Sequence, residues 1–159
     1  MIKPINFPLL KARIWQHLIG RGIADRDAQS EQSVLEKKRI LVVDDDEMNR
    51  DVLERRVQRY GCYVESVKNG EQALKKVFYG QCDMVLLDIN MPGMNGVEVL
   101  KQIRDRDEYT NLPIIMVSAQ EDDKVLGDCI QAGASDYISK PFNTIVLRTR
   151  MQSCLNAVN

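Results

Sequence analysis

Long apolar runs are missing from this sequence of 159 residues, in which no unbroken stretch of apolar residues exceeds five. A membrane-spanning helix needs about 20 such residues, so a protein with spanning helices is excluded. The first residues, MIKPINFPLLKAR, also lack the charged-then-apolar layout of a secretory signal peptide. We therefore expect a soluble cytoplasmic protein.

Clustered cysteines and histidines are also missing, and so is an excess of charge of either sign. The four cysteines (Cys62, Cys82, Cys129 and Cys154) are scattered, and the sole histidine, His17, is not near them. We expect small buried thiols of a reducing compartment rather than disulfides or a zinc site. Because 22 Lys and Arg stand against 23 Asp and Glu, bulk electrostatics predict no direct nucleic-acid binding and no binding to a membrane.

From residue 39 onward the sequence alternates short β-rich runs with helical patterns. Alternating strands and helices predict an α/β fold, in which helices cover both faces of a parallel sheet through right-handed crossovers. The expected strands are 39–44, 63–67, 83–88, 113–118 and 136–139. The expected helices run from about Met48 to Gly61, over 69–80 and 97–106, from about Val125 to Gly133, and from about Leu147 to Val158.

Polar residues follow the predicted strands at their carboxyl ends, where open parallel sheets place their ligand sites. Adjacent carboxylates repel one another unless a cation lies between them, and a hard divalent ion such as Mg²⁺ takes oxygen ligands. A carboxylate on a neighbouring strand could then attack phosphorus and form an aspartyl phosphate. Asp46 is interpreted instead as the N-cap of the first helix. The residues at this edge are Asp44, Asp45, Asp46, Asp88, Ser118 and Lys140.

The stretch from 39 to about 156 resembles the receiver domain of bacterial two-component response regulators. The resemblance covers roughly three quarters of the chain. It implies a doubly wound, flavodoxin-like sheet of five strands in the order 2-1-3-4-5. The motifs that carry it, in the family's order and spacing, are LVVDDDEMNR, VLLDINMPGMNG, PIIMVSA and AGASDYISKPF.

The resemblance also implies a role for each residue at the strand ends. Asp88 would accept a phosphoryl group from a phosphohistidine on a sensor histidine kinase or a phosphotransfer protein. Mg²⁺ would be bound by Asp88, directly by Asp45, through a water by Asp44, and by the backbone carbonyl of Asn90.

Three further positions match the family's switch and phosphate-binding residues. Ser118 would move to the phosphate once it forms, and Tyr137 would turn inward as the switch. Lys140 would pair with the phosphate, and the Lys140–Pro141 peptide bond would be cis. The resemblance thus implies a protein that catalyses only its own phosphorylation and dephosphorylation.

The expected downstream partner is an output domain or protein that recognises the phosphorylated state. The face built from the last helices and the fifth strand is the expected output surface and a candidate homodimer interface. Few residues follow the last predicted helix, so we expect the output domain to be absent from this chain or removed.

Alternative functions remain open at this point. The fold could serve as an interaction module that works without phosphorylation, or as a phosphotransfer intermediate that passes the group onward. A phosphatase with an aspartate nucleophile of the haloacid-dehalogenase type would need an acid two residues after Asp88, where the chain has Asn90. A calcium-binding EF-hand loop starting at Asp44 fails because Met48, Asn49 and Arg55 occupy its required positions.

Residues 1–38 are interpreted as an N-terminal helix and linker that precede a domain of residues 39–159. When residues 3–18 are aligned with residues 140–155, six of sixteen positions are identical. One hypothesis is that residues 1 to about 20 are the tail of a preceding receiver. The other is an amphipathic helix, with Leu10, Ile14 and Leu18 on one face, used for docking or dimerisation. Residues 20–39 are polar and are expected to form a mobile linker that becomes helical near residue 36.

Overall fold

The computed structural model describes residues 34–119 and 123–158. They form one parallel sheet of five strands in the order β2-β1-β3-β4-β5, which confirms the predicted fold. Along the chain the strands are β1 (Arg39–Val43), β2 (Tyr63–Val67), β3 (Met84–Asp88), β4 (Ile114–Ser118) and β5 (Asp136–Ser139). The helices are α3 (Glu47–Arg59), α4 (Gly70–Tyr79), α5 (Gly96–Arg104), α6 (Asp123–Gln131) and α7 (Thr144–Ala157), with a 3-10 turn at Asp107–Tyr109.

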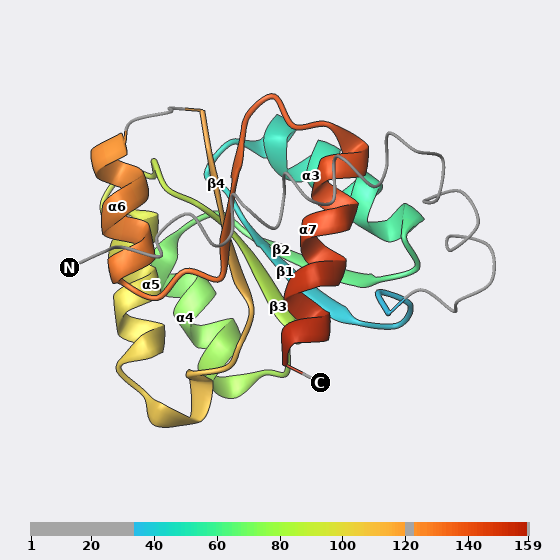
Figure 1. Cartoon of the computed structure of the whole chain (residues 1–159). Helices are drawn as coiled ribbons and strands as arrows, with labels where there is room; N and C mark the ends of the chain where they lie inside the picture. Colours follow the sequence, from blue (N-terminus) through green and yellow to red (C-terminus); the bar gives the residue numbers. More distant parts are fainter. Residues whose placement is uncertain (1–33, 120–122, 159) are drawn as a thin grey trace.

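Helices cover both faces of the sheet (Figure 1). Helices α3 and α7 pack on one face, where Leu53, Val57 and Met151 join the core with alternate residues of the strands. Helices α4, α5 and α6 cover the other face, where Val77 and Leu100 lie in a second core. Strands β3 and β4 are buried throughout, which explains their unbroken apolar runs.

The apolar spacing of α3 predicts its buried stripe only in part. Leu53 and Val57 are buried, whereas Met48 and Val52 lie on the same helix and are exposed. On α7 the corresponding exception is Val158, which is exposed at the end of the helix.

The described chain begins before the first strand. Residues 34–37 form a turn rather than the helix expected near residue 36. Leu35 is fully buried in the core beneath α3 and α7, and Lys37 N–H donates to the Gly61 carbonyl at 2.8 Å. Part of the segment interpreted as linker is therefore integral to the domain, whereas both hypotheses for residues 1 to about 20, and His17, lie outside the described residues.

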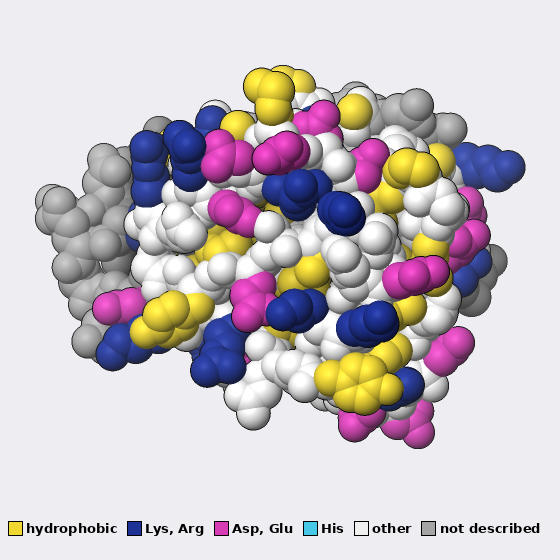
Figure 2. All heavy atoms as spheres, turned by 180° about the vertical axis from the view of Figure 1, so that it is seen from behind, with side chains coloured by type: hydrophobic (Ala, Val, Ile, Leu, Met, Phe, Trp, Pro, Cys, Tyr) yellow, Lys and Arg dark blue, Asp and Glu magenta, His cyan; other side chains and the backbone are white. Residues whose placement is uncertain are grey.

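Three further features of the described residues agree with the composition. In the described ranges, no helix has the length and hydropathy needed to cross a bilayer. Figure 2 shows the face opposite to that of Figure 1, where Lys and Arg side chains lie among Asp and Glu side chains rather than in a patch of one sign. The four cysteines are free thiols.

Candidate functional site

The acidic cluster forms because two neighbouring parallel strands end together. Val43 of β1 is in register with Leu87 of β3, so the next residues, Asp44 and Asp88, lie side by side at the carboxyl edge of the sheet. Oxygens of Asp44, Asp45 and Asp88 all lie within 4.8 Å of one another. Asp44 is 1% exposed and Asp88 5% exposed, while Asp45 is exposed. The cluster is thus a partly enclosed concentration of negative charge.

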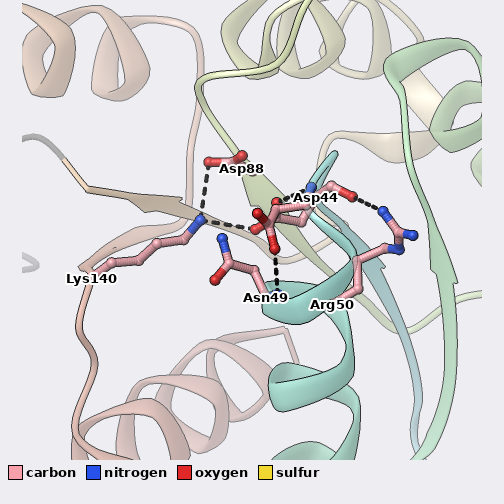
Figure 3. A network of polar contacts seen from close by, with 6 residues as sticks. Asp44, Asn49, Arg50, Asp88 and Lys140 are labelled. Carbon is pink, nitrogen blue, oxygen red and sulfur yellow. Dashed lines mark hydrogen bonds and ion pairs between the residues drawn. The ribbon is translucent and has the colours of Figure 1, made fainter.

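Lys140 reaches this cluster from the far side of β4. Its Nζ lies 2.8 Å from Asp44 Oδ2 and 3.5 Å from Asp88 Oδ1, as Figure 3 shows. The backbone N–H of Lys140 donates to the carbonyl of Ser118 at 2.7 Å, which fixes the start of the β5–α7 connection. The Lys140–Pro141 peptide bond that follows is cis, as expected. One lysine therefore contacts two buried carboxylates from different strands.

The loop between β1 and α3 is held by its own side chains. Asp46 is the N-cap of α3, because its carboxylate accepts from the Asn49 N–H at 2.9 Å. This confirms the interpretation of Asp46 as a cap. The Asp46 N–H in turn donates to Asp44 Oδ1 at 2.9 Å. The loop that carries Asp44 and Asp45 is consequently tied to the first turn of α3.

The pKa values of Asp88 and Lys140 are both raised, for different reasons. Burial raises the pKa of the Asp88 carboxyl from 3.8 to about 6, with Lys140 lowering it and Asp44 raising it. Burial would lower the pKa of the Lys140 ammonium, but its hydrogen bond to Asp44 and the charge of Asp88 raise it above its ordinary value. At neutral pH Asp88 is therefore ionised and lies beside a charged lysine.

A divalent cation fits this donor set. Three carboxylates supply the hard oxygen ligands that Mg²⁺ prefers, and Mg²⁺ needs few protein ligands because it retains waters or phosphate oxygens. One lysine leaves the cluster with excess negative charge, which a cation would offset. The residues that would hold it are Asp44, Asp45 and Asp88, with Asn90 beside them.

Other residues at the edge occupy the expected places. Ser118 ends β4 and is fully buried. Tyr137 lies on β5, half-buried against the core under α4, α5 and α6. Asn90 is exposed two residues after Asp88, and its backbone N–H donates to the Asp88 carboxylate. Their parts in binding and switching remain predictions.

The loop after β3 depends on a glycine that lies against the end of that strand. A Cβ at Gly96 would lie 2.2 Å from the carbonyl oxygen of Asp88, and the Gly96 N–H donates to the Ile89 carbonyl at 2.9 Å. Gly93 adopts a φ of 78°, which favours glycine. Both glycines shape the turn, and Gly96 also sets the close approach of α5 to Asp88.

Two residues near the cluster were missed from the sequence. Arg50 Nη1 donates to the Asp44 carbonyl oxygen at 2.8 Å. Asn49 points its side-chain amide toward Lys140 and Asp44 (Figure 3). Both belong to the motif LVVDDDEMNR, but their contacts depend on how α3, which starts at Glu47, lies against the ends of β1 and β5.

Comparison with known proteins identifies the family. The response regulator receiver domain family matches residues 40–152. The chain belongs to this family. Receiver domains are modules of two-component signalling and are typically not enzymes.

Individual relatives agree with this assignment. The chain is 38% identical over 120 residues to the alkaline phosphatase synthesis transcriptional regulatory protein PhoP of Bacillus subtilis, covering 74% of this chain and 48% of that protein. It thus spans about half the length of the curated relatives it matches.

Solved structures extend the likeness to three dimensions. A response regulator from Chloroflexus aurantiacus is 31% identical with a TM-score of 0.73, covering 76% of this receiver chain and 99% of that chain. The receiver domain of a sensor histidine kinase from Pseudomonas aeruginosa is 29% identical with a TM-score of 0.71, covering 76% and 98% of the two chains. That structure has a magnesium ion coordinated in its active-site cleft.

Proposed function

We propose that this receiver domain is a phosphorylation-dependent switch in which Asp88 accepts a phosphoryl group from a phosphohistidine. The donor would be a sensor histidine kinase or a phosphotransfer protein. The observation that carries the proposal is the placement of Asp88 beside Asp44 and Asp45, with Lys140 Nζ 3.5 Å from the Asp88 carboxylate. One lysine would offset one buried carboxylate, whereas three acids at one strand edge exceed the charge that Lys140 alone supplies.

The chemistry follows from these groups. An ionised Asp88 oxygen attacks phosphorus, an O–P bond forms, and the P–N bond to the donor imidazole breaks, so the imidazole leaves with its electron pair. The pKa of about 6 leaves Asp88 ionised at neutral pH and able to act as the nucleophile. Lys140 offsets charge on the transferred phosphoryl oxygens, because its ammonium already lies between Asp44 and Asp88.

Mg²⁺ fits the site as cofactor, with Asp44, Asp45, Asp88 and the backbone carbonyl of Asn90 as its ligands. When bound, it neutralises charge on the phosphoryl oxygens and orients them for in-line transfer. Asp44 and Asp45 hold this position through their attachment to β1 and α3. Lys140 has its own contact with Asp44, at 2.8 Å.

The proposed switch runs from Ser118 to Tyr137. Ser118 ends β4 directly beside the Asp88 strand, so its hydroxyl is within reach of a phosphate on Asp88. Tyr137 lies on the adjacent β5 in register with Met116, where movement of the β4 end alters its packing. The face of α6, β5 and α7 would carry the signal to an output domain or protein, or to a second copy of the receiver.

A test of the acceptor needs only a small phosphodonor. Intact mass would be measured after incubation with acetyl phosphate, with and without Mg²⁺, on the wild-type chain and on Asp88→Asn. A gain of one phosphoryl group that requires Mg²⁺ and is absent in the variant is expected. If Asp88→Asn were labelled equally, Asp88 would not be the acceptor.

Two alternatives predict other results. An interaction module would show neither labelling nor a change in thermal stability with beryllofluoride and Mg²⁺. A phosphotransfer intermediate would be labelled and would then lose the group to a second histidine protein. We also propose a cytoplasmic location, where a reducing environment suits the four free cysteines.

A further inference from the structure

Arg50 holds the acidic loop from the side opposite to Lys140 (Figure 3). Lys140 contacts the side chain of Asp44, whereas Arg50 Nη1 donates to its backbone carbonyl oxygen at 2.8 Å. Arg50 lies in the first turns of α3 and is partly buried. The arginine therefore acts on the main chain of the loop and leaves the carboxylates free for other partners.

The carbonyl that Arg50 holds belongs to the peptide unit that joins Asp44 to Asp45. A peptide unit is planar, so fixing its carbonyl oxygen also fixes the direction of the bond into Asp45. The Asp44 N–H donates to the Val67 carbonyl at 3.2 Å, which anchors the other side of Asp44. With both anchors in place, the Asp44–Asp45 peptide cannot rotate without breaking a hydrogen bond.

Asp45 depends on this constraint more than its neighbours do. Asp44 is buried and Asp88 ends a central strand, so packing and sheet pairing position both of them. Asp45 is exposed and lies in the loop between β1 and α3, where neither restraint operates. Its backbone is held on one side by the peptide that Arg50 contacts and on the other by the Asp46 N–H, which donates to Asp44 Oδ1 at 2.9 Å.

We propose that Arg50 is a positioning residue that directs the Asp45 carboxylate into the divalent-cation site. This inference rests on the proposed function, since it assigns a part in the metal site of that switch. Groups that orient metal ligands typically change metal affinity by about 10- to 100-fold when removed. Because Arg50 makes one contact with the loop, we expect the lower end of that range.

The test measures Mg²⁺ binding directly, by calorimetry, on the wild-type chain and on three variants. Arg50→Ala and Arg50→Met remove the donor, and methionine retains the aliphatic part of the side chain. Arg55→Ala is the matched control, because Arg55 carries the same charge on the same helix but pairs with Asp51 on the surface at 3.2 Å. Urea unfolding of each variant shows whether it is folded.

The expected result is about 10-fold weaker Mg²⁺ affinity in both Arg50 variants and a change of less than about twofold in Arg55→Ala. At saturating Mg²⁺, the labelling rate with acetyl phosphate should return to within about twofold of wild type, since the metal site is weakened rather than removed. The sign of the change separates positioning from charge, because removing a cation near the site would by itself strengthen Mg²⁺ binding through space.

Three results would overturn the inference. Wild-type affinity in Arg50→Met would show that the arginine does not position a ligand. An equal loss of Mg²⁺ affinity in Arg55→Ala would show that the loss is not specific to Arg50. If the wild-type chain binds no Mg²⁺, the proposed cofactor fails together with this inference. If the wild-type chain binds Mg²⁺, a negative result for the Arg50 variants counts against the role of Arg50 alone.

Discussion

Replacing Asp88 with asparagine should stabilise the metal-free protein at neutral pH. Burial raises the pKa of the Asp88 carboxyl from 3.8 to about 6. The charge of Lys140 lowers this pKa, and the charge of Asp44 raises it further. The native state therefore binds this proton more tightly than the unfolded chain does. Stability from this group is fully present below the unfolded pKa and is lost as the pH rises through about 6.

The size of the effect follows from the same two values. The difference between 3.8 and about 6 corresponds to about 3 kcal/mol of unfolding free energy lost by neutral pH. Asparagine has nearly the shape of a protonated carboxyl and no charge, so the variant should avoid most of this loss. We expect Asp88→Asn to be more stable by about 2 to 3 kcal/mol, with a Tm higher by roughly 5 to 10 °C.

The assay is urea unfolding followed by circular dichroism, at several pH values between about 5 and 8 and in the presence of a chelator. The difference between variant and wild type should shrink as the pH falls below about 6, because the wild-type carboxyl then becomes protonated. Millimolar Mg²⁺ should stabilise the wild type more than the variant, because the variant lacks one metal ligand.

A matched control separates this effect from a general loss of negative charge. Asp105→Asn removes an exposed carboxylate at the end of α5, where the helix has returned to the amino edge of the sheet. It should change stability by less than about 0.5 kcal/mol. An Asp88→Asn variant no more stable than wild type without metal at neutral pH, or a gain that does not depend on pH, would refute the reasoning.

Three further predictions follow from the same edge of the sheet. Lys140→Ala should lose about 3 kcal/mol of stability, because Asp44 is 1% exposed and would remain buried without its cation. Urea unfolding measures this loss, and Mg²⁺ should restore part of it. Gly96→Ala should lose about 3 kcal/mol, because the new Cβ would lie 2.2 Å from the Asp88 carbonyl oxygen, and a variant as stable as wild type would contradict this packing. Mg²⁺ affinity measured by calorimetry should fall by up to about tenfold per pH unit below about 6, because the bound metal requires an ionised Asp88; an affinity that is constant from neutral pH down to about 5 would exclude Asp88 as a ligand.

Local patterns were sufficient for the elements of the fold. The runs ILVV, MVLL and IIMV are too short for core helices and too apolar for a sheet with one exposed face, so they predict the buried central strands β1, β3 and β4. Asp46 before the first helix is a local capping signal, since the side chain bonds to a backbone group three residues away. Such contacts lie within a few residues of each other and leave a signature in the sequence.

Contacts between distant segments were less predictable. Met48 and Leu53 both fit the apolar spacing of α3, yet the first is exposed and the second buried, because only the second faces the sheet and α7. Leu35 lies outside any periodic pattern but fills the core under the same helices. The spacing of apolar residues gives a helix its period, whereas the packing of neighbouring elements decides which positions are covered.

The candidate site divides in the same way. From the sequence alone, Asp44, Asp45, Asp88 and Lys140 could be placed at or just after the ends of predicted parallel strands. That was enough to predict that all four come to one edge of the sheet. Only the tertiary structure decided that Lys140 spans two carboxylates and that Arg50 holds the Asp44 carbonyl. The reason is physical: a strand end gives a residue its edge of the sheet, but the partner of its side chain depends on register and on the position of helices folded from distant parts of the chain.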